Sequence, residues 1–111
     1  MLFRSAVPAV LVGQVSRDPA FPSVHVDNAA ASYEAVTYLA RRGHRRIAMI
    51  RGALESAGEQ RYEGYRQALL DAGLKPKPEW IVDSGNSVED GMAAMRRIEE
   101  SGELPDRKSV V

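Results

Sequence analysis

The chain has 111 residues, in which 15 lysines and arginines balance 15 aspartates and glutamates, and it contains no cysteine. A composition that is 44% hydrophobic and 27% charged is typical of a globular domain, and the missing cysteine excludes disulfides, thiolate metal sites and a thiol nucleophile. Zero net charge argues against a dedicated nucleic-acid-binding module, which would carry an excess of lysine and arginine.

The amino terminus carries a short apolar run, residues 6–12, that does not fit a secretory signal. Pro8 interrupts the run, and no cleavage site of small residues follows it. No segment approaches the roughly 20 apolar residues needed to cross a bilayer. We therefore expect a cytoplasmic protein without a membrane partner.

The first half of the chain predicts two strands and a helix. Residues 7–12 form an apolar run that ends at Gly13, and a polar loop with two prolines follows. A short extended segment, 24–26, precedes Asp27 or Asn28, either of which can cap a helix over 29–42. Gly43 stands where a left-handed stop is expected.

The second half predicts two more strand–helix pairs. The apolar run 47–50 is typical of a buried strand, and we expect a loop over 52–60 and a helix over 61–72 that stops at Gly73.

A proline-rich connector then leads to a strand over 80–82, in which Trp80 is expected to pack in the core or at the sheet edge. Ser87 and Asp90 resemble a capping box and begin a helix that runs to Gly102.

This order predicts an α/β fold of three consecutive βα units around a parallel, Rossmann-like sheet. Because such crossovers are right-handed, the loops after Val26, Ile50 and Val82 should meet at one sheet edge. Open α/β sheets bind ligands at that edge.

The sequence contains few residues that could carry catalysis or bind a metal or a phosphate. The glycines form no phosphate-binding motif, His25 and His44 have no neighbours at metal-ligand spacing, and no nucleophile elbow is present. We therefore expect no catalytic residues, no metal and no cofactor. The basic run 41–46 could contact phosphate or DNA, but a solvated turn at a helix carboxyl terminus explains it better.

Arg61 is the most informative single residue. It follows the longest predicted βα loop, and its guanidinium suits hydroxyl pairs or carboxylates on a small molecule. From position alone, an ordinary surface arginine is the better interpretation.

Four segments resemble the lac repressor and galactose repressor (LacI/GalR) family of bacterial transcription regulators. They are the runs 23–28, 35–39 and 42–52, and a helix motif R-x-x-G-[FYW]-x-x-A-[LM] that begins at Arg61. Residues 89–92 match the start of the family's E-x-G-x-x-A-M helix.

The resemblance implies part of a periplasmic-binding-protein-like sensor domain, which holds a small effector, often a sugar or a purine, between two subdomains. It also implies that Arg61 contacts the effector. Gly13 and Gln14 stand where the family usually has an aspartate, and Asn86 stands where an aromatic side chain often lines the pocket. We take these four residues as candidate ligand-binding residues.

The resemblance also sets the expected boundaries. Residues 6–22 would end the amino-terminal subdomain, and 23–105 would form the first half of the carboxy-terminal one. Operator DNA would be bound only by a helix-turn-helix headpiece outside this fragment, and the parent would be a homodimer. Segments 1–5 and 106–111 can be encoded by short-read sequencing adapters, so we expect both to be non-native tails.

Two other functions remain open. A periplasmic sugar-binding protein of a transporter shares the fold but needs a signal peptide. An α/β enzyme acting on nucleotides or sugars would need a glycine loop or a convergent acid–base set, and neither is visible.

Overall fold

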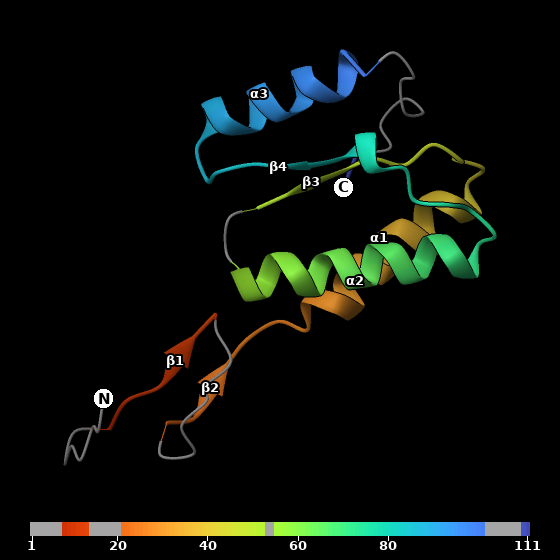
Figure 1. The fold of residues 1–111 in the computed structure, drawn as a ribbon. Helices are drawn as coiled ribbons and strands as arrows, with labels where there is room; N and C mark the ends of the chain where they lie inside the picture. Colours follow the sequence, from red (N-terminus) through yellow and green to blue (C-terminus); the bar gives the residue numbers. More distant parts are fainter. Residues whose placement is uncertain (1–7, 14–20, 53–54, 102–109) are drawn as a thin grey trace.

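A computed structural model describes residues 8–13, 21–52, 55–101 and 110–111 (Figure 1). In chain order the elements are β1 (Leu11–Val12), β2 (Ser23–Val24), α1 (Asn28–Arg41), β3 (Met49–Arg51), α2 (Glu55–Asp71), a 3-10 turn (Pro78–Trp80), β4 (Ile81–Asp83) and α3 (Val88–Glu99). β3 and β4 pair in parallel, with Met49 opposite Ile81. The α/β class with parallel strands is therefore confirmed.

Helices cover both faces of the β3–β4 sheet. α1 and α2 pack against each other on one face, and α3 lies on the other (Figure 1). Successive strand residues point to opposite faces, which divides the core into two clusters. The first, toward α1 and α2, contains Val36, Ile47, Met49, Tyr65, Ala68 and Leu69. The second, toward α3, contains Ala48, Trp80, Val82, Ala94 and Ile98.

The predicted caps of α1 and α3 and the predicted glycine stops after α1 and α2 are confirmed, whereas α3 ends at Glu99 and the stop predicted at Gly102 lies outside the described residues. A carboxylate oxygen of Asp27 accepts a hydrogen bond from a backbone N–H in the first turn of α1, and the Ser87 hydroxyl oxygen accepts one from the Asp90 N–H at 3.0 Å. Gly43 and Gly73 have φ angles of +92° and +75°, the left-handed conformation that ends a helix at low cost for glycine.

The prediction of a loop over residues 52–60 is wrong, because α2 begins at Glu55. Gly58 lies inside the first turn of this helix, where an added Cβ would be 2.8 Å from the carbonyl oxygen of Gly52. That glycine allows the helix to approach the end of β3 and does not mark a loop. Arg61 consequently lies in the second turn of α2 and not at its start.

The strand predicted over 80–82 begins one residue later, at Ile81, because Trp80 ends the 3-10 turn that Pro78 starts. Trp80 is buried under α3, as the core interpretation predicted.

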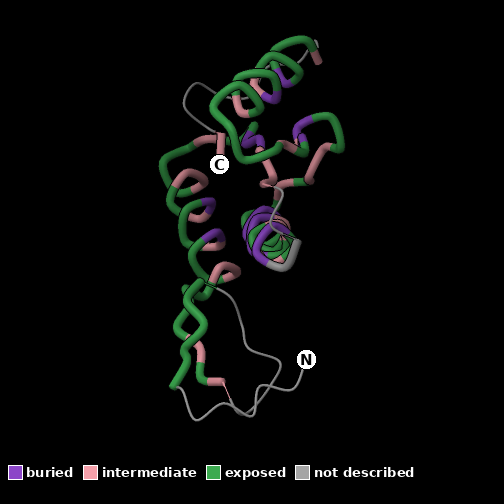
Figure 2. The backbone as a smooth tube through the Cα atoms, turned by 90° about the vertical axis from the view of Figure 1, so that its left-hand side faces the viewer, coloured by how far each residue is buried: buried purple, intermediate pink, exposed green. Residues whose placement is uncertain are grey.

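The first predicted βα unit does not share a sheet with the other two, so the expectation of one sheet containing all three strands is wrong. β2 pairs in parallel with β1 as a separate two-stranded sheet. This pair stands apart from the rest of the molecule and is exposed along almost its whole length (Figure 2). Apolar spacing identifies an extended segment but carries no information about which strand lies beside it.

Val110 and Val111 pair with the other edge of β3. Ala48 and Val110 form a parallel bridge, and the Ile50 N–H donates to the Val111 carbonyl at 2.8 Å. The tails 1–5 and 106–109 lie outside the described residues, and the non-native origin of 106–111 stays a prediction. In the described part of the chain, no helix is long and apolar enough to cross a membrane.

Candidate functional site

Arg61 is held against the start of α1. Its Nε donates a hydrogen bond to Asn28 Oδ1 at 3.1 Å, and Asn28 Nδ2 in turn donates to Gln60 Oε1 at 3.4 Å. The buried hydroxyl of Ser32 donates to the Arg61 carbonyl oxygen at 2.7 Å. The side chain and the backbone of Arg61 are thus both tied to α1.

A pocket of about 260 Å³ lies beside this arginine, between α1, α2 and β3. Its lining residues are Asn28, Ala31, Ser32, Ala35, Met49, Ile50, Arg61 and Val111. Arg61 supplies the basic side chain among them, Asn28 and Ser32 supply polar side chains, and the remaining side chains are apolar. A small apolar hollow with a few convergent polar groups is the usual form of a small-molecule site.

The carboxyl ends of β3 and β4 carry an ion pair. Arg51 Nε lies 2.5 Å from Asp83 Oδ1, and Arg51 Nη2 donates to Asp83 Oδ2 at 3.1 Å. The guanidinium carbon of Arg51 also lies 5.3 Å from the centre of the Tyr62 ring. The hydrogen bonds from Arg51 hold the pKa of the Asp83 carboxyl below its usual value, so both groups are charged at neutral pH.

The other predicted site residues are not brought into the Arg61 pocket. Asn86 is exposed after β4, where its Oδ1 would lie 3.9 Å from a Cβ added to Gly52, so it is at the same sheet edge but does not line the hollow. Gly13 ends β1 with a φ of +83° and is exposed. Gln14 lies outside the described residues.

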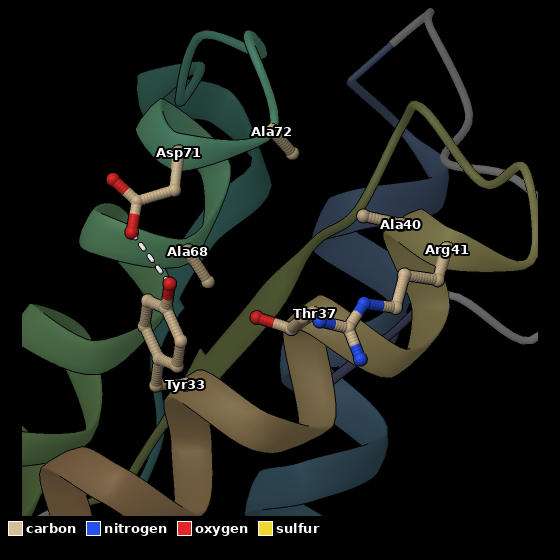
Figure 3. A pocket seen from close by; sticks show the side chains of 7 residues that line it. All are labelled: Tyr33, Thr37, Ala40, Arg41, Ala68, Asp71 and Ala72. Carbon is tan, nitrogen blue, oxygen red and sulfur yellow. Dashed lines mark hydrogen bonds between the residues drawn. The ribbon is translucent and has the colours of Figure 1, made fainter.

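A second pocket, of about 280 Å³, opens between α1 and α2 and extends from Tyr33 toward the carboxyl-terminal ends of both helices (Figure 3). Across it the Tyr33 hydroxyl donates to Asp71 Oδ2 at 2.5 Å, and this bond lowers the pKa of the Asp71 carboxyl. Asn28 and Arg61 belong to the opposite, amino-terminal halves of the same helices. The pocket in Figure 3 is therefore separate from the candidate site.

The chain matches a known protein family along nearly its whole length. Residues 2–111 match the family described as periplasmic binding proteins and sugar binding domain of the LacI family. The chain belongs to this family. The resemblance first seen in the motifs around Arg42 and Arg61 is thereby confirmed.

Relatives of the LacI-family chain include transcription regulators. It is 32% identical over 106 residues to catabolite control protein A of Priestia megaterium, with 94% of this chain and 32% of that protein covered. It is 34% identical over 96 residues to the HTH-type transcriptional repressor CytR of Escherichia coli K12, with 86% and 28% covered. A LacI transcriptional regulator from a Rhodococcus species superposes with a TM-score of 0.79 at 32% identity, over 89% of this chain and 37% of that one.

The chain therefore spans about a third of the length of the relatives it matches. Arg61 lies in the motif that carries the LacI-family resemblance, and a pocket lies beside its side chain. Sequence reasoning missed Asn28 and Gln60 as partners of Arg61. Asn28 was considered only as a helix cap, and Gln60 was assigned to a loop that is part of α2.

Proposed function

We propose that this chain is the effector-sensing part of a LacI-family transcription regulator that binds a small molecule such as a sugar or a purine. The observation that carries the proposal is the family match over residues 2–111, together with an arginine beside a small, mostly apolar pocket. Operator DNA is bound by a headpiece outside this segment, and the complete protein works as a cytoplasmic homodimer.

The subdomain to which residues 23–105 belong contributes one wall of the effector site. Arg61 supplies hydrogen-bond donors for a hydroxyl pair or a carboxylate, and Asn86 approaches from the end of β4. Gly13 and Gln14 belong to the opposite subdomain, which comprises residues 6–22 and further chain. Residues 23–105 form the first half of the subdomain that carries Arg61. Segments 1–5 and 106–111 are proposed as non-native tails, so the effector wall consists of the pocket residues other than Val111.

Effector binding controls DNA binding through a shift between two conformations. An effector that binds the closed arrangement of the two subdomains more tightly than the open one shifts the population toward closure. The same difference in affinity changes the equilibrium of DNA binding, since coupling between two sites is reciprocal.

A regulator is a better proposal than a transport protein, although the family includes periplasmic binding proteins. The relatives described above are a catabolite control protein, a transcriptional repressor and a transcriptional regulator. Those relatives also favour a protein that is not an enzyme.

The test uses the protein encoded by the complete reading frame around this segment. The thermal midpoint is measured with a panel of aldoses, nucleosides and purine bases, and the compound that raises it most is added to a gel-shift assay with the DNA upstream of the gene. We expect one compound to raise the midpoint and to change the affinity for that DNA. A protein that binds panel compounds but no DNA under any condition would contradict the regulator.

A further inference from the structure

The hydrogen bond between Arg61 and Asn28 uses the inner nitrogen of the guanidinium. Nε donates to Asn28 Oδ1, so the two terminal nitrogens are not needed to tie the side chain to α1. Because a guanidinium is planar, fixing Nε also fixes the plane in which the terminal N–H groups point. Both residues line the same pocket.

A second contact supports the orientation of the Asn28 amide. Its nitrogen donates to Gln60 Oε1, which leaves the amide oxygen turned toward Arg61. Asn28 is the first residue of α1, where the side chain of Asp27 caps the helix and defines the backbone direction. A chain of polar contacts therefore runs from Gln60 through Asn28 to Arg61.

We infer that Asn28 is a positioning residue for Arg61. Asn28 holds the guanidinium across the contact between α1 and α2, with the terminal N–H groups of the arginine available to a ligand in the pocket. A free arginine side chain loses much rotamer freedom on binding, so ordering it beforehand increases affinity for a hydroxyl pair or an oxyanion. The inference rests on the proposed function for the identity of that ligand, but the positioning is a property of the chain itself.

Asn28 is not required to hold the two helices together. Ser32 bonds the Arg61 carbonyl, and the backbone of α1 packs closely against Gly64 of α2. Removing the amide of Asn28 should therefore release the arginine side chain and leave the α1–α2 packing intact.

The test follows the Nε–Hε signal of Arg61 by NMR relaxation in the protein encoded by the complete reading frame and in its variants. Asn28→Leu keeps the approximate size of the side chain and removes the acceptor, whereas Asn28→Asp keeps an acceptor. The signal of Arg41, an exposed arginine on α1, is the internal reference. Gln60→Leu is a second variant that acts from α2 and leaves α1 unchanged.

We expect the Arg61 order parameter to exceed that of Arg41 in the original chain, to fall to the Arg41 value in Asn28→Leu, and to be retained in Asn28→Asp. Gln60→Leu should give an intermediate loss. Backbone amide shifts away from residue 28 should stay unchanged, because the helices remain packed. An Arg61 order parameter that is equal in the original chain and in Asn28→Leu would overturn the inference.

A titration with inorganic phosphate, read at the same Arg61 signal, tests the consequence for binding. The affinity should fall by about two- to tenfold in Asn28→Leu, the range that the loss of one hydrogen bond supports. Equal phosphate affinities in both proteins would contradict a role in ligand recognition. Neither measurement depends on the natural effector, so a failure here is distinguishable from a failure of the proposed function.

Discussion

The central residue of this account is Arg61, whose guanidinium is tied to α1 and lies beside a small pocket. In the complete regulator, Arg61→Ala should weaken effector binding at least tenfold, about 1.4 kcal/mol, because the donors for the ligand are lost. Calorimetric titration measures the affinity. Arg66→Ala, which removes a surface ion pair with Glu63 on the same helix, is the matched control and should leave the affinity unchanged. Equal affinities for Arg61→Ala and the original protein would refute the site.

The ion pair at the sheet edge gives a pH-dependent prediction. Because Arg51 lowers the pKa of folded Asp83, the pair stabilises the fold above the unfolded pKa of about 3.9, and this contribution is lost as the pH falls through the folded value. Asp83→Asn should lower the free energy of unfolding at pH 7 by at most about 1 kcal/mol, since the pair is partly exposed. Chemical denaturation at pH 7 and at pH 3 should show the difference shrinking at the lower pH. A difference that grows on acidification would contradict the pairing.

At the residue scale, the features that could be predicted are those that depend on a local sequence pattern, such as a helix cap. Ser87 was correctly placed at a helix start, whereas the ligand contact that the motif implies for Arg61 stays a prediction. The Asn28–Arg61 bond joins residues 33 positions apart, so no local spacing could reveal it.

At the scale of elements, the packing of α1 on α2 depends on Gly64. A Cβ at this position would overlap the carbonyl oxygen of Ala29 and lie 3.0 Å from the Tyr33 nitrogen, so the two helices would have to move apart. Gly64→Ala should lower the free energy of unfolding by about 1–3 kcal/mol through overpacking.

Gly91→Ala on α3 is the matched control, because an added Cβ there meets nothing within 4 Å. It should stabilise the protein by roughly 0.5–1 kcal/mol through helix propensity alone. Urea denaturation of both variants measures the two changes. The two changes in the free energy of unfolding should have opposite signs. A Gly64→Ala protein as stable as Gly91→Ala would show that Gly64 is not needed for close packing of α1 on α2.

Helix ends were predictable where a glycine directly follows a helical pattern. Gly43 and Gly73 follow helical patterns and do end helices. Gly58 was assigned to a loop because glycine often marks one. In the structure it lies in α2 and allows close contact with the backbone of Gly52, which a local sequence pattern does not encode. The partner of β2 was unpredictable for the same reason, since pairing is a property of the fold and not of a short segment.

At the scale of the whole molecule, the β1–β2 pair is largely exposed in the part of the chain that the structure describes. Val12 and Val24 of the pair are 79% and 64% exposed, although parallel strands are normally buried on both faces. Isolated two-stranded sheets are marginally stable in water. This exposure is consistent with the proposal that residues 6–22 belong to a second subdomain whose remaining chain covers the pair, and with a match of about a third of each relative's length.

The central claim is that this segment senses an effector for a DNA-binding regulator. The most direct test is the nucleotide sequence of the complete gene upstream of the codon for Val7. We expect an in-frame helix-turn-helix headpiece there, whose recognition helix would enter the major groove of an operator. A secretory signal peptide in that place, with no DNA-binding segment, would contradict the account and identify a transport protein instead.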